Sequence, residues 1–227
     1  MYVLILLALL MLLILGPQYW VKAVLTRYNQ KPEENFSGTG GELVRHLLDR
    51  FQLQSVQVEI TNRGDHYDPM ARVVRLGEDR FNGRTLTAIT IAAHEVGHAI
   101  QHARGEKLFL WRTRLATYSA AAQKIGSFLL FLVPLLSVIS RVPAVGLLTL
   151  LAAFLIMGSG LLVQFLTLPV ELDASFNKAL PVLESGYLES HQIPAARKIL
   201  RAAAFTYVSS ALSGLLNFWR WMQVMRK

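Results

Sequence analysis

The chain of 227 residues contains no cysteine. Disulfide bonds and thiolate metal ligands are therefore excluded, so any metal centre must be built from histidine nitrogens and carboxylate oxygens. Acidic residues are also scarce: 15 Asp and Glu stand against 23 Lys and Arg, and the formal net charge is +8. This excess of positive charge has to be explained by a partner or by a location.

Four stretches lack charged residues altogether, at 2–21, 125–140, 142–170 and 202–219. A helix needs about 20 apolar residues to cross the bilayer core, which the first and third stretches supply. The second is short, but the flanking Lys124 and Arg141 can extend to the interface, and polar residues dilute the fourth. We therefore expect a mainly α-helical membrane protein with three or four transmembrane helices. The first stretch lacks the basic start and the A-x-A site of a cleaved signal peptide, so we expect an anchor.

The basic residues gather beside the apolar stretches rather than in one patch. This is the pattern of the positive-inside rule, which places the segment between the first two stretches in the cytoplasm. A lipid bilayer is therefore the expected partner of the positive charge, and nucleic acid is not. The residues concerned are Lys22, Arg27 and Lys31 after the first stretch, and Arg104, Lys107, Arg112, Arg114 and Lys124 before the second.

Between the apolar stretches the sequence predicts a small α+β region. Apolar and polar residues alternate at 55–61, and 71–77 reads as a second short strand, which together indicate a short β-hairpin or a pair of edge strands. A helix is expected from Thr85 to Arg104, ended by Gly105. After the third stretch, Pro169 is expected in the first turn of a helix that runs to about Glu184 with a kink or break near Pro181, and another helix should begin at Pro194.

The segment His94-Glu95-Val96-Gly97-His98 carries the strongest chemical signal. Histidines at i and i+4 project from one side of a helix, one turn apart, where both can bind a single zinc ion. Glu95, a third of a turn around from His94, can accept a proton from a zinc-bound water. The alternative is a chance match, which a chain of this length gives only rarely.

A third ligand must come from elsewhere in the chain. His102 continues the i+4 series, but three ligands along one straight helix close a tetrahedron poorly, so we expect it at the surface or behind the ligands. Two membrane crossings return the chain to its starting side, which favours the segment after the third stretch as the source. Glu171 is our candidate for the ligand and Asp173 for a carboxylate that orients a ligating histidine. A plain acid at a helix start remains the alternative for Glu171.

Three further residues are candidates for stabilising the transition state. His66 and Tyr67 lie in a polar stretch before 71–76, a strand that we expect to border the cleft and pair with an extended peptide. Tyr207 could supply a phenol. The alternatives are a solvated turn for His66 and Tyr67, and a bilayer-interface anchor for Tyr207.

The chain resembles the bacterial membrane-associated neutral zinc metallopeptidases of the YugP-like type. The resemblance rests on DHYDPMARVVRLGEDRFNGRTLTAITIAAHEVGHAIQ (65–101), LPVELDAS (168–175) and RAAAFTYV (201–208), and with the apolar stretches it covers nearly the whole chain. It implies a zinc endopeptidase of the inner membrane with His94, His98 and Glu171 as ligands and Glu95 as acid/base. The chain is also distantly similar to HtpX-type membrane gluzincins, whose motif has an aspartate four residues after the ligand glutamate. Here Ser175 stands at that position.

Taken together, we expect a multi-pass membrane-anchored metalloendopeptidase with one Zn²⁺, a gluzincin-like domain facing the cytoplasm, and an unfolded or membrane-associated polypeptide as substrate. An intramembrane site-2-type protease, with the aspartate of Leu172-Asp173-Ala174 as ligand, and an inactive membrane scaffold or adaptor are the alternatives. The expected parts are an anchor (1–25), a zinc peptidase region (26–124), a transmembrane hairpin (125–168), a third-ligand helix with the helix after it (169–201), and a transmembrane or interfacial helix (202–227).

Overall fold

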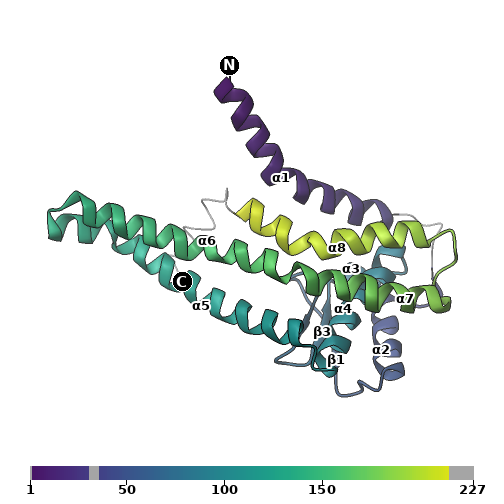
Figure 1. Cartoon of the computed structure of the whole chain (residues 1–227). Coiled ribbons are helices and arrows are strands. Elements are labelled where there is room, and N and C mark those ends of the chain that lie inside the picture. The colour runs from purple at the N-terminus through teal and green to yellow at the C-terminus, as the bar shows by residue number, and fades with distance from the viewer. Residues whose placement is uncertain (1, 31–35, 215–227) are drawn as a thin grey trace.

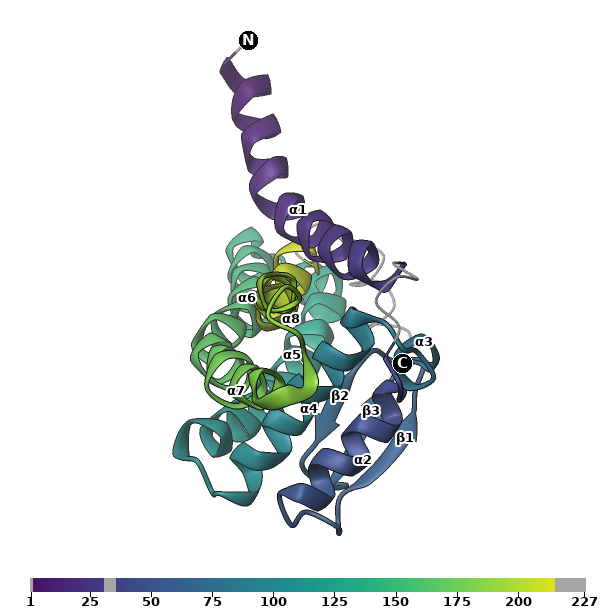
Figure 2. The ribbon, with the colours of Figure 1, turned by 90° about the vertical axis from the view of Figure 1, so that its right-hand side faces the viewer.

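The computed structural model describes residues 2–30 and 36–214, which form a mainly helical chain with one small sheet (Figures 1 and 2). The predicted helix content is thereby confirmed, and the part of the last expected helix beyond Gly214 lies outside the described residues. The elements in chain order are α1 (Tyr2–Asn29), α2 (Gly40–Arg50), β1 (Gln57–Ile60), β2 (His66–Asp68), β3 (Val73–Leu76), α3 (Glu78–Phe81), α4 (Leu86–Ala103), α5 (Lys107–Ser140), α6 (Pro143–Asp173), η2 (Ala174–Ala179), α7 (Leu180–Val182), η3 (Leu183–Tyr187) and α8 (Ile193–Gly214).

The sheet has three strands in the order β1-β3-β2, and this corrects the predicted hairpin. The two strands recognised in the sequence, β1 and β3, pair in parallel with Gln57 opposite Val73. The polar stretch read as a turn supplies β2, which pairs antiparallel with β3 through Tyr67 and Val74. The expected peptide-binding role of 71–76 is also wrong, because β3 has neighbours on both sides and offers no free edge. Alternation of residue types identifies a strand but says nothing about the direction of its partner.

Helix α4 is the centre of the domain, and it confirms the helix predicted from Thr85 to Arg104. The Thr85 hydroxyl accepts a hydrogen bond from Ala88 N at 3.2 Å and so caps the first turn. Gly105 follows the last turn with φ of +63°, the left-handed conformation that ends many helices. Every residue of α4 from Leu86 to Gln101 is buried, because the helix contacts α1, α2, α8, η2 and the strands β2 and β3.

Helices α5 and α6 form a long hairpin that extends away from the sheet and returns the chain to α4 (Figure 1). Both helices continue past the expected boundaries at 124 and 168, although α5 bends by 44° between Gly126 and Phe131. Pro169 lies inside α6 rather than in a first turn, and no break occurs at Pro181. The chain stays helical to Glu184, as predicted, and leaves the helical conformation at Ser185 and Gly186, where Gly186 has φ of +119°. The ring of Pro181, which has no N–H to donate, is tolerated because the preceding π-helical segment η2 changes the local hydrogen bonding. Helix α8 begins at Ile193, as predicted.

Among the described residues, the prediction of three or four membrane spans is not supported. One helix, from Leu4 to Asn29, is long and apolar enough to cross a bilayer, and α5 adds a second only if Lys107–Gly126 and Phe131–Ser140, bent by 44°, count as one span. Helix α1 projects from the domain (Figure 2). Its leucines are exposed, Leu4 at 71% and Leu12 at 67%. An uncharged run in a sequence does not reveal the bends and packing that decide whether a helix can cross.

Candidate metal centre

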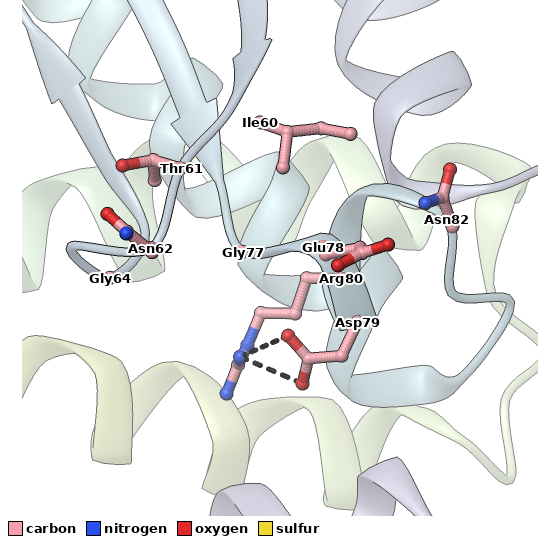
Figure 3. A pocket seen from close by; sticks show the side chains of 9 residues that line it. All are labelled: Ile60, Thr61, Asn62, Gly64, Gly77, Glu78, Asp79, Arg80 and Asn82. Carbon is pink, nitrogen blue, oxygen red and sulfur yellow. Dashed lines mark hydrogen bonds and ion pairs between the residues drawn. The ribbon is translucent and has the colours of Figure 1, made fainter.

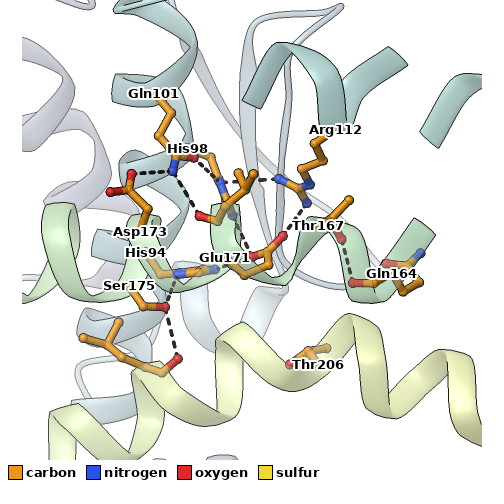
Figure 4. Close-up of polar contacts among 12 residues, drawn as sticks. His94, His98, Gln101, Arg112, Gln164, Thr167, Glu171, Asp173, Ser175 and Thr206 are labelled. Atoms are coloured by element: carbon orange, nitrogen blue, oxygen red, sulfur yellow. Dashed lines mark hydrogen bonds and ion pairs between the residues drawn. The ribbon is translucent and has the colours of Figure 1, made fainter. Parts of the chain in front are cut away.

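Three side chains from two distant segments converge beside α4 (Figure 4). His94 and His98 come from neighbouring turns of α4, and Glu171 comes from the last turn of α6. Their ligand atoms all lie within 4.8 Å of one another, and the side chains are nearly inaccessible to solvent. The Nε2 atoms of His94 and His98 lie 3.3 and 3.1 Å from Glu171 Oε2. The structure therefore places the three predicted ligands in one cluster.

The close approach of the two segments depends on Gly97. A methyl group at this position would lie 2.8 Å from the carbonyl oxygen of Ala174, closer than real contacts allow. Because Gly97 lies between the two histidines and Ala174 follows Glu171 by three residues, the missing side chain lets α6 bring its carboxylate to α4.

The hydrogen bonds of Ser175 fix the protonation of His94. The Ser175 hydroxyl donates to Leu200 O at 3.1 Å, so it can only accept at its 3.1 Å contact with His94 Nδ1. His94 therefore carries its proton on Nδ1, and the lone pair on Nε2 points toward Glu171.

Gln101 determines which ring nitrogen of His98 carries the proton. Its amide nitrogen donates to Val170 O at 3.0 Å and to Asp173 Oδ2 at 2.8 Å, which turns the amide oxygen toward His98 Nδ1 at 2.9 Å. Since that oxygen can only accept, Nδ1 of His98 is the donor and Nε2 again offers a lone pair.

Three electron-pair donors thus face one another, and a cation suits this arrangement. Oxygen or nitrogen ligands at about 2.05 Å from a tetrahedral zinc ion are separated by about 3.3 Å. The 3.1 and 3.3 Å separations at Glu171 Oε2 agree with that value. The two imidazoles and the carboxylate match the His₂Glu donor set known from catalytic zinc sites, and their neighbours hold the histidine protons on the nitrogens that face away from the cluster. The residues present therefore fit zinc.

Glu95 lies next to the cluster and is only 6% exposed. No described residue donates a hydrogen bond to its carboxylate, and burial is the main cause that raises its pKa to about 7, against the lowering effect of His94. A carboxylate whose pKa lies near neutral pH is suited to accept and return a proton.

The second oxygen of Glu171 faces Arg112 from α5. Arg112 Nη2 lies 2.6 Å from Glu171 Oε1. Although burial favours the neutral acid, the neighbouring imidazole of His98 and the positive charge of Arg112 hold the pKa of Glu171 well below its usual range. The carboxylate of Glu171 is therefore ionised, with Oε2 facing the two histidines and Oε1 facing Arg112.

Asp173, the other carboxylate considered, faces away from the three-residue cluster and contacts no histidine in it. Its oxygens accept hydrogen bonds from Gln101, Asn177 and Lys178. Burial opposes ionisation, but these hydrogen bonds lower the pKa of Asp173 to about 2. Its link to the candidate ligands runs through Gln101 to His98.

The structure places the remaining candidates from the sequence, His66, Tyr67 and Tyr207, in three different surroundings. The Nδ1 atom of His66, at the start of β2, lies within hydrogen-bond distance of the carbonyl oxygen of Gly64, at 2.9 Å. Tyr67 is buried, and its hydroxyl lies 2.8 Å from Nδ1 of His102, which itself stacks on Phe109. Tyr207 contacts Arg112, the partner of Glu171, with its ring centroid 5.2 Å from the guanidinium carbon.

Sequence reasoning missed the roles of Ser175, Gln101 and Arg112. Gln101 follows His98 by three residues on the same helix, and Ser175 occupies the position four after Glu171, so spacing could have indicated both. Nothing local pointed to Arg112, because its contact with Glu171 depends on how α5 packs.

Replacing Gly97 by valine tests the close approach. The added side chain must push Ala174 away, and such overpacking costs about 1–3 kcal/mol of unfolding free energy. Zinc affinity should fall at the same time, because Glu171 moves with Ala174. Denaturant unfolding and zinc titration in detergent measure both effects. Gly16→Val is the control, since a Cβ there meets only Leu12 at 3.9 Å; equal stability and affinity of the two variants would contradict the prediction.

A surface hollow of about 1060 Å³ lies elsewhere, between β1, the turn before β2 and α3 (Figure 3). Its walls include Asp79 and Arg80, which pair with each other at 3.1 Å. None of the three clustered side chains lines it.

The comparisons with known proteins agree with this geometry. The family described as "Putative neutral zinc metallopeptidase" matches residues 2–226. The "Putative membrane protease YugP" of Bacillus subtilis (strain 168) is 35% identical over 217 residues, which cover 92% of each chain. No solved structure matches the chain.

Proposed function

The chain belongs to the family of neutral zinc metallopeptidases matched above, and from this we propose that it hydrolyses peptide bonds with one zinc ion held by His94, His98 and Glu171. The family membership confirms the resemblance seen in the sequence. The proposal goes further, to the ligand set, the number of ions and the role of each residue.

One observation carries the proposal: three buried electron-pair donors face one another, and the partners of each histidine keep its proton on the opposite nitrogen. Burying such a group without a cation would leave lone pairs opposed in a medium of low polarity, which is costly. A divalent cation converts the same arrangement into a stable site.

When bound, zinc supplies a Lewis acid that polarises the scissile carbonyl and lowers the pKa of the attacking water. Glu95 accepts the proton of that water and passes it to the leaving amine. Ser175 and Gln101 hold the imidazole rings in orientation. The burial of the cluster restricts bulk water, which strengthens the electrostatic interactions within it.

We further propose that α1 anchors the protein in the membrane and that the substrate is an unfolded or membrane-associated polypeptide. The similarity to a protein named as a membrane protease and the exposed leucines of α1 support this. Apolar residues exposed on the α5–α6 hairpin, among them Phe131 and Leu155, are suited to contact lipid as well. A site that faces the cytoplasm, as the basic residues indicate, is part of the same proposal.

Metal analysis combined with a cleavage assay tests the proposal. Protein purified in detergent should bind one zinc ion per chain and cleave an unfolded polypeptide such as casein. A chelator should stop the cleavage and added zinc should restore it, whereas a His94→Ala, His98→Ala double variant should neither bind zinc nor cleave. Wild-type protein that takes up no zinc would instead support the inactive scaffold.

No observation favours the intramembrane alternative. In the described residues α4 is not a candidate span, and it packs against strands of the sheet. Asp173, the aspartate that this alternative requires as a ligand, points to Gln101 and Lys178.

A further inference from the structure

Arg112 is a largely buried cation whose one close carboxylate partner among the described residues is Glu171. Its side chain is 17% exposed, and Nη2 lies 2.6 Å from Oε1 of Glu171, which is 1% exposed (Figure 4). The two oxygens of Glu171 therefore have separate neighbours: Oε2 faces the two histidines and Oε1 faces the arginine. The proposed zinc chemistry uses only the first of these oxygens.

Aromatic rings hold the guanidinium of Arg112 in place. Its central carbon lies 5.2 Å from the ring centroid of Tyr207 and 5.9 Å from that of Phe109, distances typical of cation–π contacts. Phe109 also lies beside the rings of His98 and His102. The arginine is thus fixed by α5 and α8, and its position does not depend on Glu171 alone.

The approach of Arg112 to His98 is a contact without a hydrogen bond. Nη1 lies 3.4 Å from His98 Nδ1, but arginine can only donate, and Nδ1 already donates its proton to Gln101. The polar partners of the guanidinium are therefore the carboxylate of Glu171, through an ion pair, and the hydroxyl of Tyr207, through a hydrogen bond.

We propose that Arg112 is a positioning residue that holds Glu171 as a one-oxygen ligand, with Oε1 retained by the guanidinium and Oε2 left to the metal. The proposal rests on the zinc site proposed above. A carboxylate can bind a metal through one or both oxygens, and the 2.6 Å ion pair that engages Oε1 opposes the second mode. Without the arginine, Glu171 can rotate and offer both oxygens.

Arg112 has a second effect in the metal-free protein. A buried carboxylate that loses its cationic neighbour lowers the stability of the folded protein, because its charge is then uncompensated. Arg112 compensates the charge of Glu171 before any metal arrives, so the site is assembled in advance and metal binding does not have to order it.

Zinc affinity and the cobalt spectrum of Arg112→Gln test this inference. Loss of a partner that orients a ligand weakens metal binding by about 10–100-fold, so we expect that decrease by competition with a chelator. Cobalt-loaded Arg112→Gln should also show an altered visible absorption, because a released Oε1 changes the coordination. Arg112→Lys keeps the charge but lacks the planar fork, and should recover part of the affinity. Arg114→Gln, two residues on and exposed, is the matched control and should behave as wild type.

The outcomes separate this inference from the proposed function. If wild-type protein binds zinc and Arg112→Gln binds it equally well with an unchanged cobalt spectrum, Arg112 does not position Glu171, even if the variant melts at a lower temperature. If wild-type protein binds no zinc, the proposed function fails and this inference with it. Should Arg112→Gln not fold, Arg112→Lys decides: wild-type affinity and spectrum in that variant would show that the fork geometry is not needed and overturn the inference.

Discussion

Glu95→Gln should stop peptide cleavage while the protein keeps its zinc. The substituted amide has nearly the same size as the carboxylate but cannot accept the proton of the attacking water. Removal of a general base of this kind lowers the rate by about 10²–10⁴-fold. Glu95 is not one of the three clustered donor residues, and no described residue donates a hydrogen bond to it, so the amide should leave the positions of His94 and His98 unchanged.

Zinc content and the rate of casein cleavage, measured on the same preparation, check this result. Glu78→Gln is the control, since Glu78 is exposed on α3 and the same change of charge there should alter neither quantity. Cleavage by Glu95→Gln at the wild-type rate would remove Glu95 from the mechanism. Loss of zinc together with activity would show that the residue serves the site structurally.

The parts of the site that lie on one helix were predictable from the sequence, because they depend only on local geometry. The spacing of His94 and His98 places both rings on one side of α4, and Thr85 and Gly105 mark where that helix begins and ends. The return of Glu171 to α4 was predicted from the order of apolar stretches, and the α5–α6 hairpin brings it there. Its role as a ligand stays a prediction.

The parts that depend on packing between distant segments were not predictable. The parallel pairing of β1 with β3 requires a chain path that local alternation does not encode, and β2 was hidden in a polar stretch. Arg112 was interpreted as one of several basic residues near a membrane surface, and only the packing of α5 beside α6 reveals that it meets Glu171. Three or four membrane spans are not supported among the described residues for the same reason, since bends such as that of α5 are invisible in composition.

Glu171→Gln should lose zinc, whereas Asp173→Asn should keep it. The two acids are two residues apart, yet Glu171 Oε2 lies beside both histidines and Asp173 Oδ2 lies beside Gln101. Replacing a direct ligand removes one of only three protein donors, so the affinity should fall by more than the about 100-fold that loss of an orienting partner can cost. Asp173 acts on His98 only through Gln101, and its amide variant should lose less than about tenfold by the same measure.

Glu171→Gln also leaves Arg112 without its anionic partner, and a broken buried ion pair costs about 3–5 kcal/mol. Lower stability could by itself reduce zinc binding, so the double variant Glu171→Gln, Arg112→Gln is needed. Removing both charges relieves the unpaired arginine and should restore part of the stability, but zinc affinity should stay low because the ligand is still missing. Chelator competition and thermal unfolding of the four proteins separate the two effects. Zinc retained by Glu171→Gln and lost by Asp173→Asn would instead make Asp173 the third ligand, and the pairing of Glu171 with Arg112 would then be purely structural.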